Sequence, residues 1–205
     1  MRRLFLLLCA LLLWPASGQA ATLCKTKVGF TADRTLVFDG HTYTGKIWAM
    51  PGEERHEQEI EAFRPIFLLH GESPLGQVVV PQLKTVVEFV MPRELRLLDS
   101  PELKKRPVGQ ETVNGIATTK YAIDASVSEG HAQGTLWLSA DGIPMKLAGT
   151  FVPVHGKTAT IRWELNHVKI GPQPAALFEA PRDYSKLPAE AIVPLLGLRL
   201  KSPKH

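Results

Sequence analysis

Apolar and polar residues alternate along most of this chain, and the alternation is clearest between residues 113 and 184. Four alternating runs in this stretch are joined by turns that carry glycine, and the stretch ends in a segment rich in proline. Asn114-Gly115 and Asp141-Gly142 are pairs of residues that favour tight hairpin turns. A period of two residues combined with such turns predicts long antiparallel strands.

The longest alternating run covers residues 158–170. Successive side chains of a strand point to opposite faces, so this run sorts its residues into two sets. The residues expected on one face are Ile161, Trp163, Leu165 and His167, and those expected on the other are Arg162, Glu164 and Asn166.

The same pattern predicts about ten strands in all. Residues 55–62 are polar enough for a helix, but strand-like runs flank them and Arg64-Pro65 follows directly, so a strand is preferred. So many short strands with few helices indicate a barrel, a half-barrel or a sandwich. The expected strands cover residues 28–38, 43–50, 55–62, 66–69, 77–80, 86–90, 110–113, 118–127, 133–139, 145–151 and 158–170.

Few segments favour a helix. Residues 94–99 follow Pro92 and have a helical pattern, and residues 175–178 fit a single helical turn. Residues 103–107 are expected to form a loop.

Residues 187–200 predict a helix at the C-terminus. Ser185 can cap its start, Pro188 suits its first turn, and Pro194 should kink it. The organisation expected after the N-terminal segment is therefore one domain, residues 21–186, followed by a helix and tail, residues 187–205.

The N-terminus predicts a secretory signal peptide, residues 1–20. Arg2 and Arg3 precede an apolar run that ends at Trp14, and small residues lead to a cleavage point after Ala20. The run is shorter than the ~20 residues that span a bilayer, so no membrane span is expected after cleavage. The arginines stand at the very start and the run is rich in leucine, which favours the general secretory route over the twin-arginine route.

Cleavage changes the charge and the cysteine count. It would remove two arginines and no acid, which lowers the net charge from +4 to +2. The densest basic run, residues 104–106, is expected to be a solvated loop, so no nucleic-acid partner is predicted. Cys24 would be the only cysteine left, which excludes an internal disulfide and leaves a free thiol or an intermolecular pair.

Sequence motifs for catalysis or metal binding are missing. His56 and Glu57 are adjacent, so on a strand they face opposite sides and do not share a metal. His56 and Gln58 are expected on one face, while Arg55, Glu57 and Glu59 on the other suggest a ladder of charges. The sequence contains no Cys/His cluster, no nucleophile elbow and no phosphate-binding glycine loop. We therefore expect no metal, no cofactor and no enzymatic activity.

The aromatic residues leave two interpretations open. Most occupy strand positions expected to face inward, where they could form an ordinary core. Alternatively, some of them could line an apolar ligand cavity inside a curved sheet. The candidate lining residues are Trp48, Phe67, Phe89, Tyr121, Trp137 and Trp163.

An ordered set of short motifs resembles the LolA/LolB-type superfamily of periplasmic lipoprotein carriers and outer-membrane lipoprotein-sorting-like proteins. The set extends over most of residues 28–184. The motifs are YTGKIW at 43–48, ER at 54–55, NG at 114–115, TKY at 119–121, GTLWLSADGIPMK at 134–146 and LFEAPRDY at 177–184.

This resemblance implies a mainly β fold, a strongly curved antiparallel half-barrel with few short helices packed on its concave face. Better-known members hold acyl chains in an apolar cavity there and are not enzymes. We therefore expect a soluble, monomeric periplasmic carrier for a lipid acyl chain or a lipidated polypeptide. The alternative is a cell-envelope scaffold or assembly factor that acts through protein–protein contacts.

Overall fold

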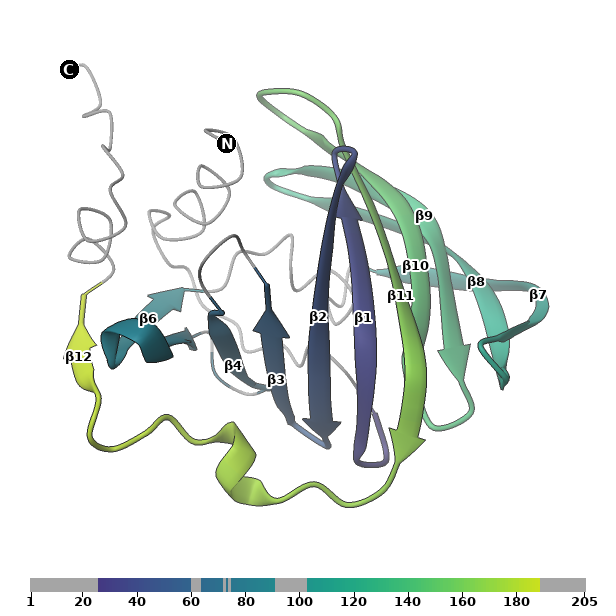
Figure 1. The fold of residues 1–205 in the computed structure, drawn as a ribbon. Coiled ribbons are helices and arrows are strands. Elements are labelled where there is room, and N and C mark those ends of the chain that lie inside the picture. Colours follow the sequence, from purple (N-terminus) through teal and green to yellow (C-terminus); the bar gives the residue numbers. More distant parts are fainter. Residues whose placement is uncertain (1–25, 60–63, 72, 74, 91–102, 189–205) are drawn as a thin grey trace.

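The chain folds into one large, curved β-sheet (Figure 1). The computed structural model describes residues 26–59, 64–71, 73, 75–90 and 103–188. The strand order is β12-β6-β5-β4-β3-β2-β1-β11-β10-β9-β8-β7, and all described neighbours are antiparallel except β12 and β6, which are parallel. The strands are β1 (Phe30–Phe38), β2 (His41–Met50), β3 (Glu53–Gln58), β4 (Ile66–His70), β5 (Leu75–Val80), β6 (Thr85–Val90), β7 (Lys104–Val113), β8 (Ile116–Val127), β9 (Gly130–Ser139), β10 (Pro144–Pro153), β11 (Ala159–Ile170) and β12 (Ser185–Leu187).

The expected fold class, a mainly β half-barrel, is confirmed, with twelve described strands rather than about ten. Residues 103–107 were expected to be a loop, but Lys104 begins β7, a strand at the edge of the sheet. Pro107 is tolerated there because an edge strand needs no donor on its free side and because the register shifts between Pro107 and Gly109.

The prediction for the C-terminal segment is wrong at its start. Ser185 does not cap a helix, because residues Ser185–Leu187 form β12 and pair with Thr85, Val86 and Val87 of β6. Residues 189–200 of the expected helix lie outside the described residues, as do the expected helix at 94–99, the predicted signal peptide and Cys24. Strand β3 confirms the expected strand at 55–62 over residues 55–58; Glu59 is described but lies outside the strand, and residues 60–62 are outside the described residues.

The two faces of the sheet differ in polarity. We call the face that carries Phe30, Ile47 and Leu165 the inner face, because these three side chains belong to the main core cluster. These three side chains are at most 4% exposed. The opposite, outer face carries residues such as Lys46 and Arg162, which are exposed. The alternation read from the sequence thus distinguishes the two faces of β1, β2 and β11.

Two glycines let the sheet bend tightly. Gly134 of β9 and Gly149 of β10 stand directly opposite each other. A Cβ atom at Gly134 would lie 2.5 Å from the carbonyl oxygen of Ala148, and one at Gly149 would lie 2.9 Å from that of Gln133. The two backbones approach too closely there for any side chain, which explains why both positions are glycine.

A bulge in β11 changes the predicted sorting of its side chains. His167 and Val168 together stand opposite Ala32, because Asp33 pairs with Asn166 and Thr31 with Lys169. His167 has a φ of 50° and turns outward, where Nδ1 lies 2.8 Å from Asp33. Val168 packs against the core instead. The expected placement of His167 with Ile161, Trp163 and Leu165 is therefore wrong, because a bulge shifts the phase of a strand.

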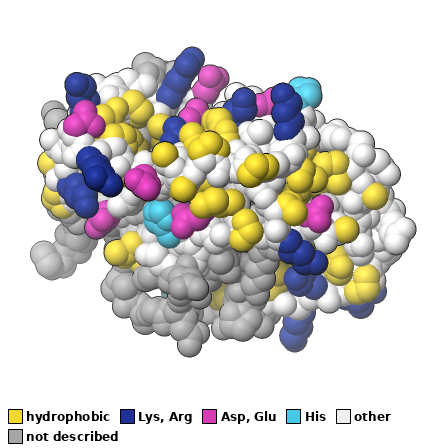
Figure 2. Space-filling view, turned by 90° about the horizontal axis from the view of Figure 1, so that it is seen from below, with side chains coloured by type: hydrophobic (Ala, Val, Ile, Leu, Met, Phe, Trp, Pro, Cys, Tyr) yellow, Lys and Arg dark blue, Asp and Glu magenta, His cyan; other side chains and the backbone are white. Residues whose placement is uncertain are grey.

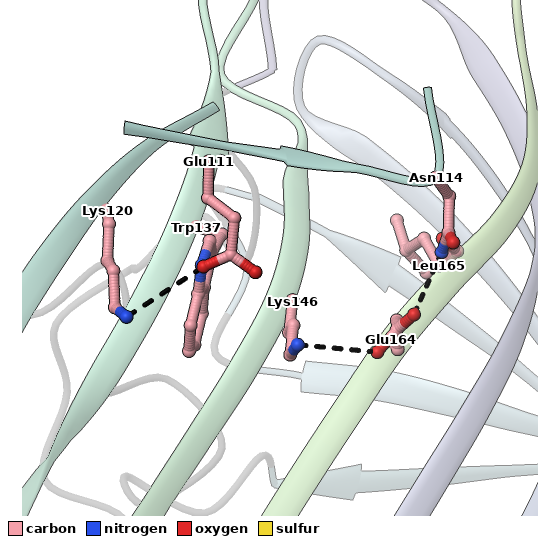
Figure 3. Close-up of polar contacts among 7 residues, drawn as sticks. All are labelled: Glu111, Asn114, Lys120, Trp137, Lys146, Glu164 and Leu165. Atoms are coloured by element: carbon pink, nitrogen blue, oxygen red, sulfur yellow. Dashed lines mark hydrogen bonds and ion pairs between the residues drawn. The ribbon is translucent and has the colours of Figure 1, made fainter. Parts of the chain in front are cut away.

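The β7–β8 hairpin covers part of the outer face. Figure 3 shows β7 crossing in front of the strands that carry Trp137, Lys146 and Glu164. At the hairpin turn, Asn114 Nδ2 donates to the carbonyl oxygen of Leu165 at 2.8 Å and to Glu164 Oε1 at 3.0 Å. The turn is thereby attached to β11, three strands beyond β8. The main core cluster consists of Phe30, Ala32, Ile47, Ala49, Val113, Trp137, Ile143, Met145 and Leu165.

The segment after β11 packs on the outer face at the other end of the sheet. It includes a single 3-10 turn, η3 (Ala175–Phe178), which confirms the helical turn expected at 175–178. Arg55 Nη1 donates to the carbonyl oxygen of Leu177 at 3.0 Å. Further along, Ala180 and Tyr184 pack against the buried cluster of Leu68, Val79 and Val86. Among the described residues, this segment therefore packs against the outer face. Within the described residues, no helix is long and apolar enough to cross a membrane.

Candidate functional site

The inner face carries an apolar surface at the end of the sheet where β1 ends and β11 begins. Tyr121, Leu136, Leu147, Trp163 and Leu36 pair directly across five strands. The next such row contains Ile123, Gly134, Gly149, Ile161 and Phe38. Leu136 and Leu147 are buried, but the other large side chains are only half-buried. We call these half-buried residues the apolar patch: Leu36, Phe38, Tyr121, Ile123, Ile161 and Trp163.

Four of the six candidate cavity residues lie on the inner face. Trp163 and Tyr121 belong to the apolar patch, with Leu147 and Leu136 between them. Phe67 and Phe89 lie farther along the sheet, where their rings meet edge to face at a centroid distance of 6.4 Å. Phe89 is only 6% exposed and serves mainly as core. Whether these residues line a cavity stays a prediction.

Trp48 and Trp137 do not share a surface with the other four. Trp48 pairs with Arg55 and Trp137 pairs with Lys146, both on the outer face. The strand register therefore corrects the expectation that these two tryptophans line the same inner cavity as the other four residues. The sequence misled here because aromatic residues of opposite phase look alike when only their hydrophobicity is considered.

Both outer tryptophans lie against cations. Trp137 has the Nζ atoms of Lys120 and Lys146 at 5.0 Å from its ring, and its Nε1 donates to Glu111 at 2.8 Å (Figure 3). Trp48 has Lys46 and Arg55 at 5.5 and 5.6 Å. Cation–π contacts of this kind are stabilising, and Trp137, which is 6% exposed, also belongs to the main core cluster. Both tryptophans therefore have a structural role on the outer face.

A cluster of polar side chains interrupts the apolar inner face near its middle. Arg34 of β1 lies in one row with Gly45 of β2 and Gln58 of β3. Because Gly45 has no side chain, the Arg34 guanidinium passes over β2 and reaches β3. Nη2 donates to Gln58 Oε1 at 2.7 Å, and Nη1 lies 2.8 Å from His56 Nδ1. On the other side of the imidazole, His56 Nε2 lies 2.6 Å from Glu54 Oε2. We call these four side chains the polar cluster: Arg34, Glu54, His56 and Gln58.

The contacts define the protonation state of His56. An arginine can only donate, so His56 Nδ1 must accept and the proton must sit on Nε2, which donates to Glu54. The pKa of His56 is lowered, first by burial and then by the charge of Arg34. The hydrogen bond to Glu54 and the charge of Glu54 act in the opposite direction but do not outweigh these two causes. The imidazole is therefore neutral and links a cation to an anion. The cluster as a whole carries no net charge.

Two atoms of the polar cluster lack a hydrogen-bond partner. Arg34 Nε and Glu54 Oε1 are enclosed, and neither bonds to any residue that the structure describes. Burial lowers the pKa of Arg34 to about 10, although the charge of Glu54 opposes this shift. Unsatisfied groups are rare in protein interiors and require an explanation. An N–H donor of Arg34 and a carboxylate oxygen of Glu54, on opposite sides of His56, are thus left without a partner among the described residues.

The sequence pattern did not single out Arg34 or Glu54. It placed His56 and Gln58 on one face and Arg55 and Glu57 on the other, which the structure confirms. The signal for Arg34 was present in the alternation, since Phe30 and Ala32 are both buried and Arg34 continues their phase. On the outer side of β3, Arg55 pairs with Glu57 at 2.6 Å, as the expected ladder of charges suggested.

Outside the polar cluster, each described histidine that forms an ion pair does so with one carboxylate. His70 lies 2.5 Å from Glu53, His131 lies 3.3 Å from Asp124, and His167 faces Asp33. Among the described residues, no three histidine, cysteine or acidic side chains are placed to hold one metal ion. Seen from below, the surface mixes apolar, basic and acidic side chains without a region of one charge sign (Figure 2).

Comparisons with known proteins support the fold. No protein-family model matches the chain, and no curated protein matches it at a significant level. Among solved structures, MucB matches with 16% identity and a TM-score of 0.50 over 79% of this chain and 60% of MucB. The MucA/MucB complex from Pseudomonas aeruginosa matches with 16% sequence identity and a TM-score of 0.50, and the match covers 78% of this chain and 58% of that chain. The chain thus spans about 60% of the length of the MucB structures.

Two further structures match over most of their length. An uncharacterised conserved protein from Thermus thermophilus is 13% identical with a TM-score of 0.51, and the match covers 79% of this chain and 91% of that one. The LolA superfamily protein NE2245 from Nitrosomonas europaea is 9% identical, and the match covers 75% of this chain and 90% of that chain. Its TM-score is 0.42, too low to support an argument about the fold. MucB-like proteins share the LolA-like fold. The LolA-like resemblance is therefore confirmed as a resemblance of fold.

Proposed function

We propose that this protein is a periplasmic carrier that binds the alkyl chain of a lipid or of a lipidated polypeptide on its inner face. The observation that carries the proposal is the apolar patch. Its six large side chains share one face across β8, β1 and β11 and keep part of their surface accessible. Transfer of alkyl surface from water to such a site contributes ~25 cal/mol per Å².

The surroundings of the patch fit binding better than catalysis. Apart from the Tyr121 hydroxyl and the Trp163 indole N–H, which donates to the carbonyl oxygen of Pro144, its rows carry only apolar side chains and glycines, so they offer mainly non-directional contact to an alkyl chain. Location in the periplasm is supported by the predicted signal peptide at residues 1–20. We propose a binding protein and not an enzyme.

The carrier role is tested by titrating the purified protein with a fluorescent fatty acid. Saturable binding is expected, and Ile161→Gln should weaken it about tenfold because the variant places an amide on the patch. Arg162→Gln is the matched control, since Arg162 is the next residue of β11 and lies on the outer face. The absence of saturable binding, or an equal effect of both variants, would contradict the carrier role.

A second candidate role is binding of a partner protein. The matched MucB structures include a complex with MucA, and the sheet of this protein ends in β7, nine of whose ten residues are exposed. Affinity purification from the envelope that recovered one stoichiometric protein, without any co-purified lipid by native mass spectrometry, would favour this role.

A further inference from the structure

The connection between β10 and β11 places apolar side chains in contact with water. Val154 is 63% exposed and Val152 is 44% exposed, with Pro153 between them. No other large apolar side chain among the described residues is as exposed as that of Val154. In Figure 1 this connection forms the uppermost part of the sheet. We call Val152, Pro153 and Val154 the apolar tip.

The turn between β8 and β9 holds the apolar tip in place. The backbone N–H of Val154 donates to the carbonyl oxygen of Glu129 at 2.9 Å. Next to this bond, a Cβ atom at Gly130 would lie 2.3 Å from the carbonyl oxygen of Val152, so the two connections touch at their backbones. The fold therefore fixes the two valines at the surface. Adjacent exposed apolar residues of this kind mark interaction sites.

The apolar tip is continuous with the apolar patch. Phe151 directly precedes the tip on β10 and pairs with Ala159 of β11, while Gly149 pairs with Ile161, a member of the patch. Two residues of strand, about 7 Å, separate these two pairs. The inner-face positions of β10 and β11 between the tip and the patch are thus apolar side chains or glycine. An alkyl chain that enters at the tip meets no polar side chain of these two strands before it reaches the patch.

We propose that the apolar tip inserts into the surface of a phospholipid bilayer, and that the alkyl ligand passes between this bilayer and the apolar patch along β10 and β11. The contact with the bilayer stands without a ligand, whereas the route rests on the carrier role. A bilayer is the expected partner because it contains the alkyl chains that the patch would bind. Its interior also accepts apolar side chains without requiring a particular shape.

The charges near the tip favour neither sign of lipid headgroup. His155 and Lys157 belong to the same connection as the tip. Glu129 lies in the turn that holds the tip, and Asp39, at the end of β1, accepts from the backbone N–H of Thr160 at 2.9 Å. Burial of apolar side chains should therefore drive the contact, as it does for other segments that lie in a bilayer interface. We expect binding to zwitterionic phosphatidylcholine that changes little with added salt.

Flotation with phosphatidylcholine vesicles, using protein purified from the periplasm, tests the contact. Val154→Asp should lower the partition coefficient about tenfold, because a carboxylate stays in water where the valine would enter lipid. Val154→Leu keeps an apolar tip and should bind at least as tightly as the wild type. Val108→Asp is the matched control, since Val108 is 45% exposed on β7, and it should keep the wild-type partition coefficient. Circular dichroism confirms that each variant is folded.

Transfer of a fluorescent fatty acid from loaded vesicles to the protein tests the route. Val154→Asp should slow this transfer about tenfold, in proportion to the loss of bilayer contact. The affinity of the same variant for the fatty acid added in solution should equal that of the wild type, because Val154 lies outside the apolar patch.

The outcomes separate the bilayer contact from the carrier role. If the wild type does not float with the vesicles, or if Val154→Asp and Val108→Asp reduce flotation equally, the contact is refuted, and titration in solution still decides the carrier role. If the protein floats but binds no fatty acid, the carrier role and the route are refuted while the contact stands. Equal transfer rates for the wild type and Val154→Asp would refute the route.

Discussion

Replacement of Arg34 by methionine is the perturbation that best tests how the inner face is held together. Arg34 makes two hydrogen bonds, at 2.7 Å to Gln58 and at 2.8 Å to His56, and balances the buried charge of Glu54. Its loss leaves Glu54 as an uncompensated buried anion. Removal of one partner of such a pair costs about 3–5 kcal/mol in free energy of unfolding.

The double variant Arg34→Met/Glu54→Gln makes the prediction more specific. With both charges absent, the remaining cost is that of lost hydrogen bonds, about 1–2 kcal/mol. Glu54→Gln alone should cost about 2–4 kcal/mol, since it leaves the arginine unbalanced. The three values imply a favourable coupling between Arg34 and Glu54 of at least about 3 kcal/mol.

The assay is equilibrium unfolding in urea, followed by circular dichroism and by tryptophan fluorescence. Glu57→Gln is the control, because its side chain is 40% exposed and a surface pair contributes at most about 1 kcal/mol. Additive effects of Arg34→Met and Glu54→Gln, with a coupling near zero, would show that the two charges do not interact through His56 and would refute the reasoning.

Three further predictions concern pH, curvature and the hairpin turn. The pKa of His56 is lowered in the folded state, so as the pH falls the unfolded chain takes up a proton at this residue before the folded chain does. The free energy of unfolding should therefore fall below pH ~6.5 by up to ~1.4 kcal/mol per pH unit. In His56→Gln, the urea midpoint should depend less on pH between pH 7 and pH 5. Gly134→Ala should cost about 1–3 kcal/mol because its Cβ meets Ala148, whereas Gly171→Ala, with open space around it, should leave the thermal midpoint nearly unchanged. Asn114→Gly keeps the turn but loses both side-chain hydrogen bonds to β11. It should lower the free energy of unfolding by about 1–2 kcal/mol and speed up amide hydrogen exchange at the turn. An exchange rate equal to that of the wild type would contradict this prediction.

The strands were predictable because most of them obey a two-residue period that one buried face imposes. The hairpin at Asn114-Gly115 was also readable, because both residues of such a turn take a positive φ, 48° at Asn114 and 83° at Gly115. Strand β7 was missed over most of its length because nearly all of its residues are exposed, so no alternation marks it. Strand β12 was missed because three residues are too few to show a period.

The candidate site was only partly predictable. Trp163 and Tyr121 were assigned to the inner face because their runs alternate regularly. Trp48 and Trp137 were misplaced because hydrophobicity alone does not show that each ring is covered by two cations on the outer face. The link from Arg34 to His56 joins residues 22 positions apart and depends on the strand register, which no local pattern contains.

The position of the tryptophans relative to the sheet allows the most direct test of the carrier role. Variants that retain Trp48, Trp137 or Trp163 as the single tryptophan are titrated with a fatty acid brominated along its chain, which quenches only fluorophores in contact with it. The account predicts saturable quenching of Trp163 on the inner face and little quenching of Trp48 and Trp137 on the outer face. Equal quenching of all three, or quenching of Trp48 and Trp137 alone, would contradict binding on the inner face.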